Sequence, residues 1–291
     1  GSPIAGFWLS STGAGGGSVE SGAIPCGTLA SVATLSLRLP AAGRPRAHLL
    51  QCELRDGTRA VTSNEWRIWS VPEAKLALPH GTAVTHLPFV AEACPGVARL
   101  GPGMPVPVEA RVLVTDTLGE SALTFLAAGG RVLLLSPERR EGCPGQLPRA
   151  GGQTVYRTVP FNLGREGNMG TLVANHPALG GFPHEGWCDF CFEPVITGAW
   201  PFALHPFGKA RIAPIIRSIG HHLAMDDKAY LFELGVGGGR LLASSLRLDA
   251  AWRNDPAAEY LLQSFLRYLA ARRLPRAGSR ITVARLRRVI A

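Results

Sequence analysis

The segment from His184 to Cys191 holds the densest group of reactive side chains in the sequence. It runs His-Glu-Gly-Trp-Cys-Asp-Phe-Cys, and His176 lies a short distance upstream. Two cysteines and two histidines could together supply four zinc ligands. The spacing is irregular, however, and no second cysteine pair is present; the Pro-Cys and His-x-Glu arrangement of zinc deaminases is also missing. We therefore predict packed thiols at Cys188 and Cys191 and no metal.

Residues 182–207 contain seven aromatic side chains with acidic residues and histidines between them. Most of these rings are expected to pack in the core, because aromatic side chains bury a large apolar area. Exposed rings next to carboxylates and imidazoles suit sugars, whose C–H faces stack while their hydroxyls need hydrogen bonds. The candidate ligand-binding residues are Trp187, His184, Asp189, Trp200 and Glu185.

No catalytic residue can be assigned from the sequence. Cys143 stands in Gly-Cys-Pro-Gly, well past the nearest predicted strand, whereas a nucleophile elbow places its nucleophile at a strand-to-helix turn. Glycoside hydrolysis needs two carboxylates across a sugar ring. The acidic residues Glu166, Glu185, Asp189 and Glu193 do not indicate such a pair. The sequence leaves open whether the chain is part of an enzyme.

The glycine-rich segment 235–239 resembles a phosphate-binding loop only superficially. A dinucleotide loop needs a helix after its glycines, so that the helix N-terminus meets the pyrophosphate. Here the glycines lead into Leu241-Leu242-Ala243, a pattern that favours a strand. We predict a hairpin turn and no cofactor.

Length and charge restrict the class of protein. A chain of 291 residues with 46% hydrophobic residues suggests two domains, and it has no apolar run long enough to span a membrane. The net charge of +9 comes almost entirely from eight arginines between Arg267 and Ala291, and no acidic residue follows Glu259. Because the basic tail, residues 272–291, lacks interleaved aromatic residues, we expect no nucleic-acid binding. The six cysteines are scattered, except for Cys188 and Cys191, and indicate free thiols.

Residues 1–72 show the period-two alternation of β-strands. After an apolar opening at Ile4–Leu9, strands are predicted at Leu29–Leu39, His48–Leu54 and Val61–Val71, with a turn at Asp56-Gly57. So few strands make only part of a β-sandwich.

Residues 73–271 indicate an α/β domain. After a proline-rich linker with one strand near Ala83–Leu87, a β-α-β unit is predicted over residues 111–136. Its helix is expected to start with a capping box formed by Thr117 and Glu120 and to end at Gly129-Gly130. Further strands are predicted at 212–219, 229–234 and 240–248. A final helix is capped by Asp255 and Pro256.

Several segments resemble the C-terminal region of bacterial glycoside hydrolase family two (β-galactosidase-like) proteins. Residues 63–72, Ser-Asn-Glu-Trp-Arg-Ile-Trp-Ser-Val-Pro, resemble the end of the immunoglobulin-like domain that follows the catalytic barrel in many of them. Residues 112–116 and 125–135 are similar to their glutamine-amidotransferase-like module. Residues 176–190 fit the middle of that module, and 232–248 with the last helix resemble its end.

The resemblance implies an α/β fold with an N-terminal all-β part. A partial immunoglobulin-like β-sandwich (1–72) is expected before a flavodoxin-like, class I glutamine-amidotransferase-like domain (73–271) and the basic tail. The amidotransferase-like module in this family typically lacks its nucleophile. The implied role is that of a non-catalytic C-terminal accessory region of a glycoside hydrolase acting on β-linked carbohydrates.

Such a region would support the catalytic barrel of the same polypeptide, mediate homo-oligomer contacts, or contact carbohydrate directly. The resemblance implies a soluble bacterial protein, and its compartment, cytoplasmic or secreted, is left open by the sequence. Two alternatives stay open: a stand-alone carbohydrate-binding protein, and an enzyme with a Cys/His site around His184 and Cys188.

Overall fold

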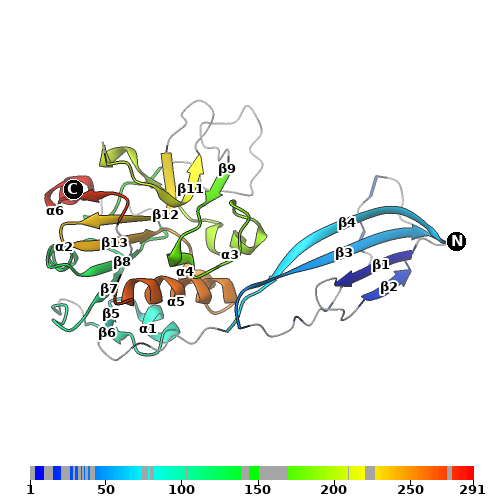
Figure 1. The fold of residues 1–291 in the computed structure, drawn as a ribbon, viewed down its shortest axis with the longest axis horizontal. Helices are drawn as coiled ribbons and strands as arrows, with labels where there is room; N and C mark the ends of the chain where they lie inside the picture. Colours follow the sequence, from blue (N-terminus) through cyan, green and yellow to red (C-terminus); the bar gives the residue numbers. More distant parts are fainter. Residues whose placement is uncertain are drawn as a thin grey trace. The chain divides into compact units, whose positions relative to one another are not determined.

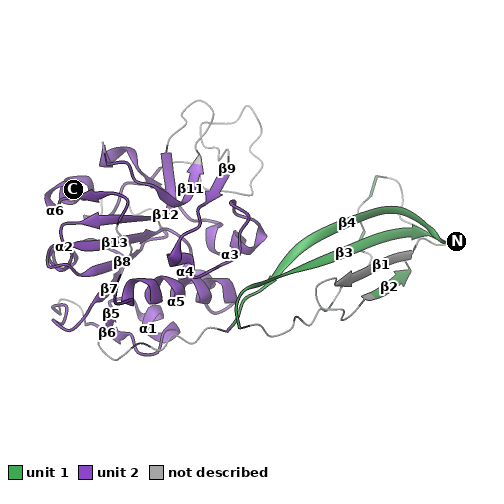
Figure 2. Ribbon diagram, in the orientation of Figure 1, with its two compact units in different colours: residues 1–72 green, residues 73–291 purple. Residues whose placement is uncertain are grey.

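The chain forms two compact units, residues 1–72 and 73–291 (Figure 2). The computed structural model describes residues 4–9, 16–20, 43–73, 82–101, 104–138, 144–150, 170–208, 210–219, 227–273 and 277–291, with Leu78 and a few single positions between residues 27 and 39. Together the units give a mixed α/β protein with one large mixed sheet and one small antiparallel sheet.

In unit 1 the described strands form an antiparallel sheet in the order β2-β1-β3-β4. They are β1 (Ile4–Leu9), β2 (Gly16–Glu20), β3 (Arg46–Asp56) and β4 (Arg59–Ser70). The predicted strands around residues 48–54 and 61–71 are confirmed, and so is the turn between them, where Gly57 has a φ of +58°. Most of the strand predicted at Leu29–Leu39 lies outside the described residues.

Unit 2 is built on a sheet in the order β6-β5-β7-β8-β13-β12-β11-β9. Its first five strands are parallel to one another, and the remaining three alternate in direction. The strands on this path are β5 (Ala83–Thr85), β6 (Ala98–Arg99), β7 (Val112–Thr115), β8 (Arg131–Leu135), β9 (Gly170–Val173), β11 (Pro214–Ile219), β12 (Asp227–Val236) and β13 (Gly239–Ser244). Short strands β10 (Phe202–Ala203) and β14 (Arg280–Ile281) also pair with β12.

Helices cover both faces of this sheet (Figure 1). They are α1 (Pro88–Ala93), α2 (Glu120–Ala127), α3 (Glu193–Ile196), α4 (Leu248–Ala251), α5 (Pro256–Ala270) and α6 (Val283–Ile290), with 3-10 turns η1 (Pro177–Leu179), η2 (Phe190–Phe192) and η3 (His205–Phe207). The parallel strands have apolar residues on both faces, as expected for a sheet covered on both sides.

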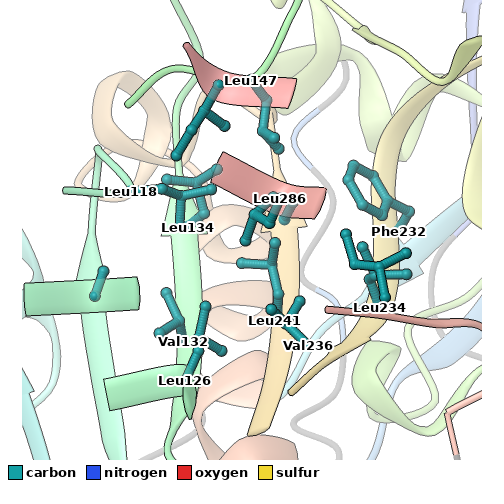
Figure 3. Close-up of a cluster of buried hydrophobic side chains, with 14 of the residues drawn as sticks. Leu118, Leu126, Val132, Leu134, Leu147, Phe232, Leu234, Val236, Leu241 and Leu286 are labelled. Atoms are coloured by element: carbon teal, nitrogen blue, oxygen red, sulfur yellow. The ribbon is translucent and has the colours of Figure 1, made fainter. Parts of the chain in front are cut away.

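A buried apolar core lies beneath α2 and α6. Val132 and Leu134 of β8 and Leu241 of β13 are completely buried there against Leu126 of α2 (Figure 3). Leu286 of α6 is completely buried in the same cluster. Residues 277–291, which belong to the basic tail predicted at 272–291, therefore complete the core of unit 2.

The β-α-β unit β7-α2-β8 is present with parallel strands, but its predicted capping box is wrong. The helix starts at Glu120 with Gly119 as its N-cap, and no side chain caps it. Leu118 is buried, and its N–H donates to the Gly145 carbonyl at 2.8 Å, so the chain enters the helix later than the sequence suggests. The linker predicted before it holds α1 and β6 in addition to β5.

The final helix follows its local signals. The Asp255 carboxylate accepts a hydrogen bond from the Ala257 N–H at 2.7 Å, and Pro256 occupies the first turn, as predicted. The predicted apolar face is buried along its length, at Leu261, Leu262, Phe265, Leu266 and Leu269.

The glycine-rich segment forms the predicted hairpin turn between β12 and β13. Its glycines are needed because backbone from α2 passes close by. A Cβ on Gly239 would lie 2.6 Å from the Leu126 carbonyl oxygen and closer still to that of Gly130. These glycines therefore allow the hairpin to pack closely against the end of α2.

This close approach predicts a specific loss of stability. Replacing Gly239→Ala should lower the free energy of unfolding by about 1–3 kcal/mol, because the methyl group must displace backbone. Urea unfolding followed by far-UV circular dichroism measures this. The control is Gly278→Ala, where a Cβ meets nothing within 4 Å. Equal stability of the two variants would contradict the packing argument.

Candidate functional site

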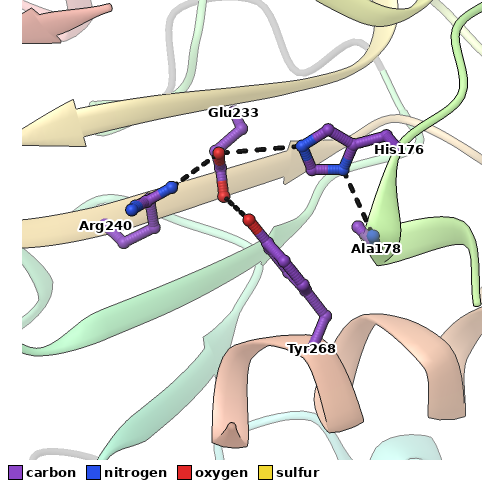
Figure 4. A network of polar contacts seen from close by, with 5 residues as sticks. All are labelled: His176, Ala178, Glu233, Arg240 and Tyr268. Carbon is purple, nitrogen blue, oxygen red and sulfur yellow. Dashed lines mark hydrogen bonds and ion pairs between the residues drawn. The ribbon is translucent and has the colours of Figure 1, made fainter. Parts of the chain in front are cut away.

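The interior of unit 2 contains a buried charge pair. Glu233 lies in the middle of β12, and its side chain is only 9% exposed. Nη1 of Arg240, on β13, lies 2.6 Å from Glu233 Oε2, and the Tyr268 hydroxyl of α5 donates to Oε1 at 2.7 Å (Figure 4). Two neighbouring strands and a helix thus meet at one carboxylate.

His176 completes this polar network from the segment between β9 and η1. Its Nε2 lies 3.8 Å from Glu233 Oε2, and its ring packs edge-on against Tyr268 with centroids 5.3 Å apart. Nδ1 accepts a hydrogen bond from the Ala178 N–H at 3.2 Å, so in neutral His176 the proton sits on Nε2. The N–H of the imidazole therefore faces the carboxylate.

The contacts around Glu233 set its ionisation. Burial on its own raises the pKa of the carboxyl. The contacts with His176 and Tyr268 and the charge of Arg240 together outweigh burial and hold the pKa below its ordinary value. Glu233 is therefore ionised at neutral pH and balances Arg240.

This network is suited to holding segments together and poorly suited to catalysis. A general base needs a nitrogen or oxygen that can take a proton from a substrate. In His176 one ring nitrogen is engaged by backbone and the other faces Glu233. The network therefore fixes α5 and the turn η1 against the sheet.

A small cavity lies at the carboxyl ends of the parallel strands, the usual place for ligands in open α/β sheets. Its volume is about 190 Å³, and Asp116, Ser136, Glu138 and Asp249 line it together with apolar residues. Among the described residues no group of three or more His, Cys, Asp or Glu side chains could hold a metal ion, in this cavity or elsewhere.

Ser136 is the hydroxyl in this cavity that directly follows a strand, β8. It donates to Gln146 Oε1 at 2.7 Å and accepts from Arg149 Nη2 at 2.6 Å. Arg149 also stacks over the Phe202 ring at 4.1 Å, and burial lowers its pKa to about 9. Because an amide and a guanidinium hold the hydroxyl, this is not the arrangement of an activated serine.

The structure places four of the five predicted ligand-binding residues in one loop. Trp187 is 51% exposed and pairs through an isolated β-bridge with Leu172, which is 47% exposed. Phe190, at the start of η2, is 79% exposed. We call Leu172, Trp187 and Phe190 the aromatic surface. Glu185 is exposed within the same loop.

His184 and Asp189 are half-buried and shape this loop. His184 Nδ1 accepts from the Gly186 N–H at 3.2 Å, and burial lowers the imidazole pKa, partly offset by Asp189. The Asp189 carboxylate caps η2 by accepting from the Cys191 N–H at 3.1 Å. Trp200 lies in a different segment, beyond α3, where it is half-buried and its carbonyl accepts from Arg149.

The two cysteines of this loop are packed thiols. Cys188 is buried and Cys191 half-buried, and burial raises the pKa of both. The Cys191 thiol donates to the Asp189 carboxylate at 2.7 Å. Both are therefore protonated at neutral pH, which suits packing better than nucleophilic attack. Cys143 lies outside the described residues.

Residues 113–291 match the model of a protein family described as a domain of unknown function, DUF8487. The chain belongs to this family. No curated protein matches the chain. The DUF8487 match includes the Glu233 network, the aromatic surface and α6. Within the described part of the chain, no helix has the length and apolar character needed to cross a membrane.

The Glu233 network was not predicted from the sequence, although the sequence contains one signal for it. Glu233 interrupts an otherwise apolar strand, and a carboxylate at such a position requires partners. Those partners could not be named, because Tyr268 lies on a distant helix and His176 on a loop after the strand β9, which the sequence did not predict.

Removing the carboxylate should destabilise unit 2 and change its response to acid. Glu233→Gln leaves Arg240 buried without its counter-charge, at a cost of about 3–5 kcal/mol. Because the folded-state pKa of Glu233 is lowered, its contribution is complete above the pKa of the unfolded chain and is lost as the pH falls through the folded-state value. Wild-type stability should therefore fall more steeply in acid than that of the variant.

Urea unfolding at a series of pH values between neutral and acidic measures both effects. Glu92→Gln is the control, because Glu92 forms an exposed pair with Arg253 and such pairs contribute at most about 1 kcal/mol. Parallel stability curves for wild type and Glu233→Gln would show that this carboxylate is not held by its charge partners.

Proposed function

We propose that this chain is a non-catalytic accessory region of a glycoside hydrolase acting on β-linked carbohydrates, and that unit 2 contacts carbohydrate through the loop around Trp187. On this proposal unit 1 is part of an immunoglobulin-like sandwich and unit 2 is a flavodoxin-like, amidotransferase-like domain. The run of parallel strands with helices on both faces supports the second assignment.

The observation that carries the proposal is the exposure of the aromatic surface. Large apolar side chains exposed to water are unfavourable, and contiguous patches of them mark binding sites. Leu172 and Trp187 are paired across a β-bridge, so their side chains lie on the same side of the chain. An exposed indole offers a flat face for the C–H groups of a sugar ring, and Glu185 stands close in sequence to bind hydroxyls.

Both polar centres of unit 2 favour a role without catalysis. The Ser136 hydroxyl is held by Gln146 and Arg149, and both nitrogens of His176 are directed to protein groups. The raised pKa values of Cys188 and Cys191 argue against the alternative of a Cys/His-site enzyme. A stand-alone carbohydrate-binding protein would use the same aromatic surface and is the second candidate.

Binding of β-linked disaccharides such as cellobiose and lactose tests the sugar contact. Isothermal titration calorimetry should detect weak binding, and Trp187→Ala should weaken it about tenfold or more, as expected for a central aromatic contact. Trp66→Ala is the matched control, because Trp66 is 41% exposed but lies in unit 1. Undiminished binding in Trp187→Ala, or equal losses in both variants, would exclude this loop as the sugar site.

A further inference from the structure

A groove with a volume of about 800 Å³ runs along α2 in unit 2. The segment Pro105–Val108 forms one wall, and Ser121, Thr124 and Phe125 of α2 form another. The groove ends at Arg111, just before β7, and at Arg131, the first residue of β8. Its volume lies in the range of small-molecule sites. It shares no lining residue with the aromatic surface or the Glu233 network.

The walls of the groove offer a rigid apolar surface. Phe125 packs tightly on Gly130, where an added Cβ would meet the phenyl ring at 2.5 Å, so the ring is held in place. Pro105 and Pro107 restrict the opposite wall, and Val108 there is fully exposed. Apolar side chains fixed beside open space bind an apolar group without the cost of first becoming ordered.

The charges of the groove are unbalanced. Arg111, Arg131 and Arg272 line it, against the single carboxylate of Glu120. Glu120 is already bound by Arg287, whose Nη2 lies 2.9 Å from its Oε2.

The charges of two of the three arginines are available to bind an anion. Arg131 donates to the carbonyls of Leu269 and Ala271 at the end of α5 and so satisfies that helix terminus. Arg111 and Arg272 are exposed, and within the described ranges no carboxylate pairs with either. Burial and the nearby charges of Arg111 and Arg240 lower the pKa of Arg131, as expected where cations are crowded.

We propose that this groove is a binding site for a small carboxylate with an apolar body, whose aliphatic or aromatic part lies against Phe125 and Val106 and whose anionic group is bound by Arg111 and Arg272. A guanidinium pairs with a carboxylate through two parallel hydrogen bonds, and this selects an acid over a neutral molecule of the same shape. The site does not depend on the carbohydrate contact.

Octanoate and octan-1-ol are the probes, because they share an alkyl chain and differ in charge. Isothermal titration calorimetry should show octanoate binding about tenfold or more tightly than octan-1-ol. The double variant Arg111→Ala/Arg272→Ala should remove that preference while leaving octan-1-ol unaffected. Arg211→Ala, which removes an exposed charge outside the groove, is the control and should bind octanoate like wild type.

A variant that fills the groove tests the apolar part. Thr124 is exposed on α2, so Thr124→Trp should fold like wild type by circular dichroism and abolish binding of both probes. Equal affinities for the two probes, an undiminished preference for octanoate in the double variant, or wild-type binding by Thr124→Trp would each overturn the proposal.

Discussion

A carboxylate inside a sheet must have its charge balanced by groups that the fold brings to it. Glu233 obtains these groups from three separate segments: Arg240 across the hairpin, Tyr268 from α5 and His176 from the loop before η1. Leaving any of them out would expose the charge to an apolar interior. This requirement fixes the hairpin, the helix and the loop in one arrangement. The loop that carries Trp187 follows directly after η1, so the position of the aromatic surface depends on the same carboxylate.

Local signals in the sequence predicted the elements whose causes are local. The Asp255 cap, the turn between β12 and β13 and the β-α-β unit each depend on neighbouring residues and appear as expected. The predicted helix start at Thr117 is wrong, because the burial of Leu118, a tertiary effect, decides where the helix begins. The role of residues 277–291 was also hidden. The sequence of this short arginine-rich segment is typical of a solvated tail. In the structure, however, Leu286 is buried in the core.

The candidate sites also differ in how far they could be predicted from the sequence. Grouped aromatic and polar residues made the loop at 182–192 a candidate for ligand contact, and the structure leaves Trp187 51% exposed there. Trp200 instead lies in another segment beside Arg149. The groove along α2 could not be found from the sequence, because Arg111 and Arg272 lie far apart in the chain and meet only after folding.

The central claim is that this region works beside a catalytic barrel in one polypeptide. The measurement that tests it most directly is the intact mass of the native protein purified from its source, with peptide sequencing of the same sample. The account predicts a mass far above the 30.9 kDa of this chain, with upstream peptides that belong to a glycosidase barrel. A native mass near 30.9 kDa would contradict it and would favour a stand-alone carbohydrate-binding protein.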